Sequence, residues 1–275
     1  RVFQYQVISG TATWTQLGPD IDGEAAGDGS GNGMSLSSDG SIVAIGAVSN
    51  DGNGTNSGHV RIFKYQVISG TPTWTQLGQD IDGEAAQDSS GRLSLSSDGS
   101  RVAISGTNND GTSGNADDNR GHVRIFDYNG SAWVQVGQDI DGEAAADVSG
   151  KSVSLSSDGS RVAISSTLND GANGADSGHV RIYDYNGSAW VQVGGDIDGE
   201  AAGDLSGWSV SLSSDGSRVA IGARSNDGAN GADSGHVRVY SISSGESYQY
   251  AWDVDSGSTP PSGTYYATVS GTTVA

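Results

Sequence analysis

The stretch Ser152–Ser165, with the sequence SVSLSSDGSRVAIS, decides the fold class. Its first half, Ser152–Ser156, alternates small polar with apolar residues, which is the pattern of a half-buried β-strand. The Asp158-Gly159 pair follows, and Asp-Gly between two such runs indicates a tight hairpin turn. Arg161–Ile164 is the returning strand, so the stretch predicts an antiparallel β-hairpin.

The residues that follow extend this hairpin into a four-stranded unit. A loop rich in Asn, Asp and Gly runs over 169–178, and a third strand is predicted at His179–Tyr183. Asn186-Gly187 is a second turn signal, and Ala189–Val193 is the fourth strand. The unit therefore consists of four short antiparallel strands, and residues 196–206 lead into the next unit.

The whole unit recurs along the chain at intervals of 57 to 63 residues between equivalent histidines. Four short strands per unit of about 60 residues are typical of a β-propeller blade. Helical repeats are excluded because no segment has helical periodicity with caps, a β-solenoid has shorter periods, and independent sandwiches need about 100 residues each. The predicted fold is all-β: four tandem propeller-like blades. The landmarks are DIDGEAA from Asp20, Asp80, Asp139 and Asp196, the turn residues Asp39, Asp98, Asp158 and Asp215, and His59, His122, His179 and His236.

Residue size fits this architecture. Ser and Ala on the strand that lines the narrow axis allow close approach of neighbouring blades, whereas aromatic residues suit the wider outer strand. The tryptophans predicted on the outer strand are Trp14, Trp74, Trp133 and Trp190.

Three segments of the last unit, 206–210, 219–223 and 235–240, resemble the strands of the FG-GAP repeat of integrin-α-type propellers. The resemblance covers residues 1–242. The recurring segments DIDGEAA and NDG are similar to repeats of large secreted or surface proteins of aquatic microbes. It implies a non-enzymatic, extracellular adhesion module. The calcium loop of that family lies between the first two of these strands, where this chain has only the short turn at Asp39 and its equivalents, so that site does not carry over.

The two ends depart from the repeat. Residues 1–5 match the third strand of a unit and residues 13–18 its fourth, so the sequence begins partway through a unit. An excerpt of a longer array, a small ring closed by strand exchange, or edges that pair with other chains would each explain this. Residues 243–275 form a β-rich tail, with strands predicted at 247–252 and 264–269; it either opens an Ig-like module or supplies the last outer strand.

The amino-acid composition limits the classes of partner that the protein can bind. The net charge is −20, from 33 acidic and 13 basic residues. Nucleic acid and anionic membrane surfaces are excluded as partners because both need clustered basic residues. No apolar run is long enough to span a membrane. Cys is absent, so disulfides are excluded.

The acidic DIDGEAA loops are the predicted metal sites. Oxygen ligands at relative positions 1, 3, 5 and 9 suit a looped Ca²⁺ site, since Ca²⁺ takes six to eight hard oxygens at flexible angles. An acidic connector whose Asp residues cap turns explains the same pattern. The candidate ligands are Asp20, Asp22, Glu24 and Asp28; Asp80, Asp82, Glu84 and Asp88; Asp139, Asp141, Glu143 and Asp147; and Asp196, Asp198, Glu200 and Asp204.

Other polar positions favour structural roles. The Asn-Asp-Gly loops beginning at Asn50, Asn109, Asn169 and Asn226 are expected to be turns, because these residues tolerate positive φ. The four histidines occupy one repeat position, whereas a catalytic site needs one asymmetric constellation. We expect them to contact a neighbouring blade or loop, and the nearby Arg61, Arg124, Arg181 and Arg238 to meet carboxylates.

The sequence thus predicts an adhesion or assembly module that binds a surface protein or glycan, or associates with itself through blade edges. Two alternatives are a filament subunit and a carbohydrate-binding propeller. The second needs exposed aromatic residues, and Trp208 is the best candidate because it replaces Gly33, Arg92 and Lys151 of the other units. An enzyme needs non-repeated His, Tyr or Arg residues clustered at the axis, and the sequence does not indicate such a set.

Overall fold

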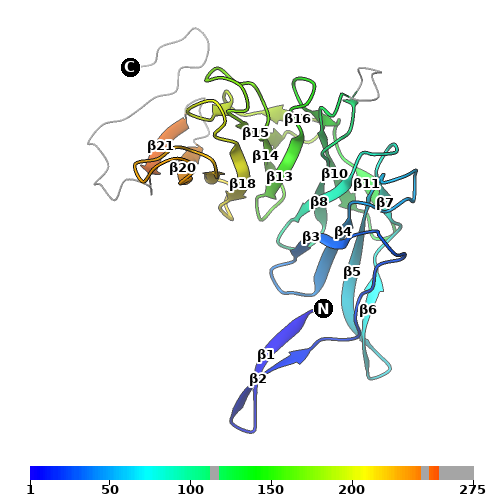
Figure 1. The fold of residues 1–275 in the computed structure, drawn as a ribbon. Coiled ribbons are helices and arrows are strands. Elements are labelled where there is room, and N and C mark those ends of the chain that lie inside the picture. Colours follow the sequence, from blue (N-terminus) through cyan, green and yellow to red (C-terminus); the bar gives the residue numbers. More distant parts are fainter. Residues whose placement is uncertain (112–117, 243–247, 254–275) are drawn as a thin grey trace.

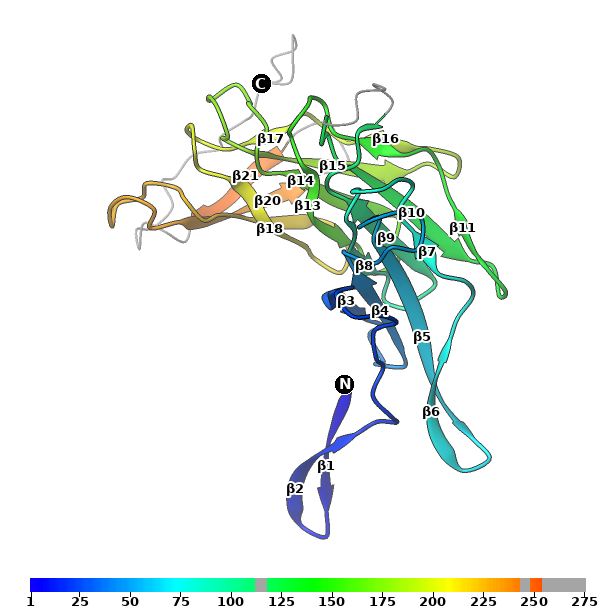
Figure 2. The same ribbon diagram turned by 45° about the vertical axis from the view of Figure 1, so that its right-hand side comes forward.

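The computed structural model describes residues 1–111, 118–242 and 248–253. These residues form antiparallel sheets that stand side by side in an open arc (Figures 1 and 2). The all-β propeller-like prediction is confirmed. The predicted strand at 264–269 lies outside the described residues.

Four sheets are blades of four strands, each ordered from the inner to the outer strand. Blade 1 is β3 (Ser30–Leu36), β4 (Ile42–Ala47), β5 (His59–Ile68) and β6 (Thr71–Gln76); blade 2 is β8 (Ser90–Leu95), β9 (Arg101–Gly106), β10 (His122–Tyr128) and β11 (Trp133–Gln135). Blade 3 is β13 (Ser149–Leu155), β14 (Arg161–Ser166), β15 (His179–Tyr185) and β16 (Trp190–Gln192); blade 4 is β18 (Ser206–Leu212), β19 (Arg218–Ala223), β20 (His236–Ile242) and β21 (Tyr248–Asp253).

The first strands lie apart from the blades as a hairpin. β1 (Phe3–Ile8) pairs with β2 (Thr11–Gln16) in a two-stranded sheet at one end of the arc (Figure 1). It corresponds to the outer half of a preceding blade. At the opposite end, β21 pairs with β20 and takes the outer position of blade 4.

The connector between blades contributes a strand that the sequence pattern did not predict. Its Ile-Asp dipeptide pairs with the first two residues of the third strand of the preceding blade, as in the register of His59 with Asp82. These two-residue strands are β7 (Ile81–Asp82), β12 (Ile140–Asp141) and β17 (Ile197–Asp198). They anchor the acidic loops beside the histidines.

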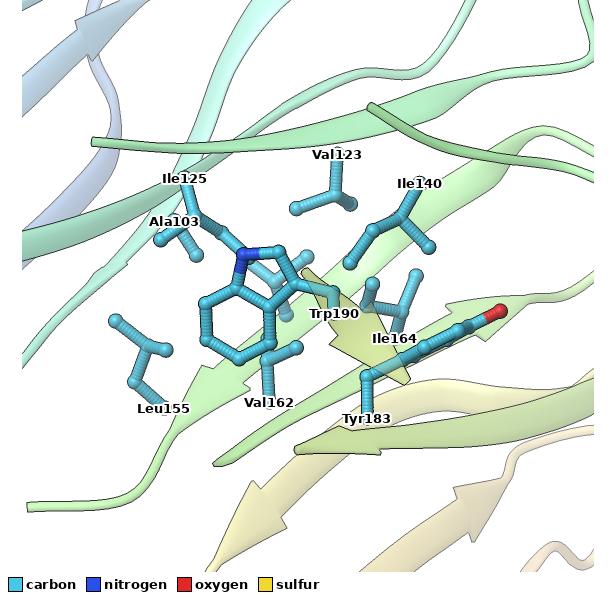
Figure 3. Packing of buried hydrophobic residues seen from close by; sticks show 10 residues of the cluster. Ala103, Val123, Ile125, Ile140, Leu155, Val162, Ile164, Tyr183 and Trp190 are labelled. Carbon is cyan, nitrogen blue, oxygen red and sulfur yellow. The ribbon is translucent and has the colours of Figure 1, made fainter. Parts of the chain in front are cut away.

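The hydrophobic core lies between blades. Trp190 of blade 3 projects between Val123, Ile125 and Ile140 of blade 2 and Val162 of its own blade (Figure 3). Its indole Nε1 donates to the Val136 carbonyl at 2.9 Å, so the side chain is both buried and satisfied. Each junction therefore holds a small core of its own, and apolar burial joins each blade to its neighbour.

Small residues bring the inner strands into contact. Gly150 of β13 packs against Ser105 of β9, and any Cβ added to Gly150 would overlap the Ser105 Cβ. Gly150 also has φ +89°, a conformation that favours glycine. Serine hydroxyls then bridge the blades, as where the Leu155 amide donates to Ser94 Oγ at 3.0 Å. The Ser- and Gly-rich inner strand is thus a requirement of blade packing.

Candidate functional site at the blade junctions

One buried histidine begins the third strand of each blade. His59, His122 and His179 are each about 1% exposed. In blade 1, the Nδ1 of His59 faces Glu24 of the loop before the blade and Asp80 of the loop after it, at 3.7 Å and 3.9 Å. The site thus combines donors from two successive acidic loops.

The same arrangement recurs at the next two blades. In each group, one atom from Glu, His and Asp lies within 4.8 Å of the others. The imidazole is the buried member, and the carboxylates are partly or fully open to solvent. The groups are Glu24, His59 and Asp80; Glu84, His122 and Asp139; and Glu143, His179 and Asp196.

An arginine two residues after each histidine completes the cluster. Arg124 Nη1 lies 3.5 Å from Glu84 Oε1, and its Nη2 donates to the Asp82 carbonyl at 2.6 Å. Arg61 and Arg181 make the same two contacts in their own blades. The expectation that these arginines meet carboxylates is confirmed.

Burial controls the charge of the cluster. Desolvation, assisted by the nearby Arg124 charge, lowers the pKa of His122 to about 4, and burial and Arg181 do the same for His179. Both imidazoles are therefore neutral at pH 7. Desolvation also raises the pKa of Glu84 and Asp141. A neutral imidazole with two carboxylates is a donor set that divalent transition metals accept.

The structure separates the carboxylates that the sequence grouped within one loop. The last Asp of each loop is buried and caps a turn: Asp88 Oδ2 accepts the amides of Glu84 and Ala85 and the Asn109 side chain. The equivalent Asp28, Asp147 and Asp204 each accept a loop amide and an Asn side chain.

The first and second Asp of each loop lie elsewhere. Asp20, Asp80, Asp139 and Asp196 accept a Gln amide from the preceding outer strand. Asp82, Asp141 and Asp198 sit in the short fifth strands, and Asp22 offers its carbonyl to Arg61. Within the described residues, the structure does not bring three carboxylates of one loop together as ligands. It brings the Glu of one loop close to the first Asp of the next loop, beside a histidine. Calcium binding stays a prediction.

The fourth copy of the cluster is less complete. His236 Nδ1 lies 3.5 Å from Glu200 Oε2, and Arg238 pairs with Glu200 Oε1. Among the residues that the structure describes, no third donor joins them.

The short turns do not provide the calcium site of the resembled family. Asp39 Oδ1 accepts the Ser37 hydroxyl and the Ser41 amide, and these hydrogen bonds lower the pKa of Asp39 to about 2. Asp98, Asp158 and Asp215 cap their turns in the same way. These carboxylates stabilise hairpins, and their turns are too short to wrap a cation.

The Asn-Asp-Gly loops are also structural. Asn50 is buried, donates to Asp28 and accepts the Gly52 amide, while Asp51 accepts the Asn56 amide. Asn109, Asn169 and Asn226 are likewise buried and donate to Asp88, Asp147 and Asp204. These loops lock each acidic connector to the blade.

Comparison with known proteins supports the fold. A family model described as the FG-GAP repeat matches residues 197–240. No curated protein matches the chain in a sequence search. A protein from Bacteroides uniformis assigned as a 6-phosphogluconolactonase is similar in structure at a TM-score of 0.50 and 17% identity; the match covers 81% of this chain and 52% of that one.

Other solved structures match less well. The hydrazine synthase of Kuenenia stuttgartiensis gives a TM-score of 0.47 at 13% identity, covering 79% of this chain and 53% of that one. The periplasmic gluconolactonase of Pseudomonas aeruginosa gives 0.42 at 12%, covering 90% and 77%. The chain thus spans about half the length of the first two structures.

The matched segment, 197–240, runs from β17 to β20 and contains most of one repeat unit. The preceding units share its landmarks and its strand order. The chain therefore contains an FG-GAP repeat at residues 197–240 within an array of propeller-like blades.

Proposed function

We propose that this protein is a non-enzymatic adhesion or assembly module that acts outside the cell. The observation that carries the proposal is a sheet face of blade 4 that none of the described residues covers. Val237 on that face is 40% exposed, whereas its counterparts Val60, Val123 and Val180 are fully buried by the next blade.

The uncovered face keeps the residues that dock a blade elsewhere. Gly235 corresponds to Gly121, where an added Cβ would overlap the Ser149 backbone of the next blade. Gly222 corresponds to Ser105, which receives Gly150. Trp208, Arg224 and His236 border the hollow that remains on this face.

The opposite end of the arc offers the matching surface. Gly31 of β3 has φ +93°, and no atom of the described residues lies within 4 Å of an added Cβ, although its counterpart Gly150 is in close contact. Met34 on the same strand is 68% exposed. We assign the face of blade 4 to the inner strand of a second copy. The β1–β2 hairpin occupies the position of the outer two strands of a preceding blade. For a full blade to dock there, β20–β21 of the second copy must replace this hairpin.

Sedimentation velocity over a range of protein concentrations tests the assembly. We expect reversible oligomers, which the variant Gly222→Leu should dissociate because the larger side chain blocks the docking face. Ser131→Leu, in an exposed hairpin turn, is the matched control and should not change the distribution. A monomer at every concentration, or oligomers that tolerate Gly222→Leu, would contradict self-assembly.

A divalent cation that stabilises the junctions is a second candidate feature. Its support is the Glu–His–Asp group at three junctions, with Glu Oε2 turned towards the imidazole while Oε1 faces arginine. The imidazole nitrogen favours zinc over calcium, which prefers oxygen ligands. Calcium at the acidic loops remains the expectation from the sequence.

The proposal excludes catalysis by the junction clusters. Its support is their repetition, because a catalytic site needs a single asymmetric arrangement of acid, base and substrate pocket. One structure of similar fold is named as a 6-phosphogluconolactonase, and that name belongs to that protein. Assay of the purified chain with gluconolactones should show no hydrolysis above the spontaneous rate; turnover would contradict the non-enzymatic role.

A further inference from the structure

Three basic residues gather near the inner strands, in a protein of net charge −20. Arg92 and Lys151 line one hollow, and the neighbouring positive charges of Arg92 and Arg224 help burial to lower the pKa of Lys151. In the described part of the chain, none of the three pairs with a carboxylate, whereas most other arginines do. Like charges have been brought together without acidic partners.

The arrangement is unique within the repeat. Arg92 and Lys151 follow the Ser-Gly pair of their strands, where blade 1 has Asn32 and blade 4 has Trp208. Arg224 stands where the other blades have Val48, Thr107 and Thr167. The junction clusters are the same in each blade, but this group is asymmetric. A requirement of the fold would appear in every copy, so blade packing does not explain these three cations.

Trp208 holds two of the cations in place. The Arg224 guanidinium carbon lies 3.5 Å from the Trp208 ring centroid, and Lys151 Nζ lies 4.5 Å from it. Cation–π attraction of this kind orients a charged side chain without neutralising it. Both cations keep their capacity to bind an anion.

Desolvation adds to the argument. Arg92 is partly buried, and this desolvation lowers its pKa. Polar groups that could add hydrogen bonds border the same hollow, namely Asn32, Ser89 and Asn108. At physiological ionic strength charges beyond about 8 Å are largely screened, so the acidic surface elsewhere does not cancel a local positive site.

We propose that Arg92, Lys151 and Arg224 bind an oxyanion, a carboxylate or sulfate group carried by an extracellular glycan. Guanidinium groups bind such groups through paired N–H donors, and lysine adds a point charge. A glycan suits the site because the ligand must present a localised anion at the inner strands without the dense charge of a nucleic acid. The inference specifies the ligand of the adhesion role. It does not require self-assembly, although Trp208 and Arg224 also border the face of blade 4 that is proposed to dock a second copy.

Isothermal titration with matched oligosaccharides tests the proposal. We expect oligogalacturonate to bind, its methyl ester to bind at least tenfold more weakly, and inorganic sulfate to compete. A sulfated galactan oligosaccharide shows whether sulfate is accepted in place of carboxylate. Binding should weaken as salt rises, because charge supplies the attraction.

Variants locate the site. Lys151→Ala and Arg224→Ala should each reduce affinity about tenfold, and Lys151→Glu should abolish binding. Lys64→Ala removes an exposed cation on β5 as the matched control and should leave affinity unchanged. Thermal unfolding of each variant separates loss of the site from loss of the fold.

Contrary outcomes are distinct from those of the assembly test. Equal binding of the methyl ester, or unchanged affinity in the Lys151 and Arg224 variants, would overturn the oxyanion site. Absence of binding to both acidic oligosaccharides would do the same. Sedimentation in the presence and absence of the oligosaccharide reports assembly separately, so either proposal can fail alone.

Discussion

The junctions inside the blade array and the two ends of the array contain the same residues in different surroundings. Gly150 is packed against Ser105. Gly31 has almost the same φ, but a Cβ built on it would have no atom of the described residues within 4 Å. The backbone has the same conformation at these two positions. The difference indicates that each unit is stabilised in part by contacts with the neighbouring units, as expected for repeat proteins.

The tryptophans give the same comparison for apolar burial. Trp190 is 3% exposed and donates to the preceding blade, whereas Trp14 on the terminal hairpin is 66% exposed. Each contacts a tyrosine ring of its own sheet: the ring centroids lie 5.1 Å apart for Trp190 and Tyr185 and 5.3 Å apart for Trp14 and Tyr5. The aromatic pair is therefore local, and burial depends on a preceding blade.

Removal of the indole should give the largest difference in stability between a blade junction and the terminal hairpin. Trp190→Ala leaves a cavity between blades 2 and 3 and should cost about 3–5 kcal/mol. Trp14→Ala should cost less than about 1 kcal/mol, since an exposed aromatic pair contributes little more than its own contact. Urea unfolding monitored by circular dichroism measures both, and equal losses would mean that Trp14 is covered in solution.

Substitutions at Gly31 and Gly150 separate the cost of backbone strain from the cost of disturbing the contact between blades. Gly31→Ala should cost about 1–2 kcal/mol, because the left-handed conformation disfavours a Cβ. Gly150→Ala pays the same strain and also forces the inner strands apart, which adds about 1–3 kcal/mol of overpacking. Comparison of melting temperatures gives the difference; no difference would indicate that the blades separate freely.

Acid should weaken the junctions through their histidines. The folded pKa of His122 and His179, about 4, lies below the ordinary value of about 6.5, so the unfolded chain binds these protons more readily. Stability is fully present above pH 6.5 and falls as the pH drops towards 4, by up to about 2 kcal/mol per histidine between pH 7 and 5. The raised pKa of Glu84 acts in the opposite direction and offsets part of this loss.

Thermal unfolding across this pH range measures the effect. The double variant His122→Asn/His179→Asn should lose most of the slope between pH 7 and 5. A slope that survives in the variant would assign the acid sensitivity to groups outside the two junctions.

Metal binding should have the smallest effect and should distinguish complete from incomplete clusters. At free Zn²⁺ ten times above Kd, one site adds about 1.4 kcal/mol of stability. We expect Zn²⁺ to raise the melting temperature more than Ca²⁺ or Mg²⁺, with Glu84→Gln reducing the rise and Asp39→Asn, a turn carboxylate, leaving it unchanged. A rise with Ca²⁺ alone would favour the acidic loops as calcium sites, and no rise with any cation would remove both metal assignments.

The sequence predicted the blades well because their strands are set by local alternation and turns. The four predicted strands of the third unit lie within or beside β13, β14, β15 and β16. The fifth strand was missed because a two-residue Ile-Asp pairing has no periodicity of its own. The side-chain partners of Asp88 and Asp147 were equally invisible in the linear pattern.

Candidate sites were harder to predict because their members come from different units. Glu84 and Asp139 meet at His122 only through the packing of two loops against one strand. The cations near Trp208 are spread over three blades, so only the departure of Trp208 from its repeat equivalents was visible in the sequence. A comparison of all non-repeated positions would have found Arg224 as well.

The glycine-to-serine contact between blades makes the units interchangeable. Gly150 docks on Ser105, and Gly207 docks on Ser165 in the same manner. Excision of the third unit would bring Gly207 opposite Ser105 and recreate the contact without a foreign surface. Gain or loss of a whole unit would therefore lengthen or shorten the array by one blade and would preserve the contact between neighbouring blades.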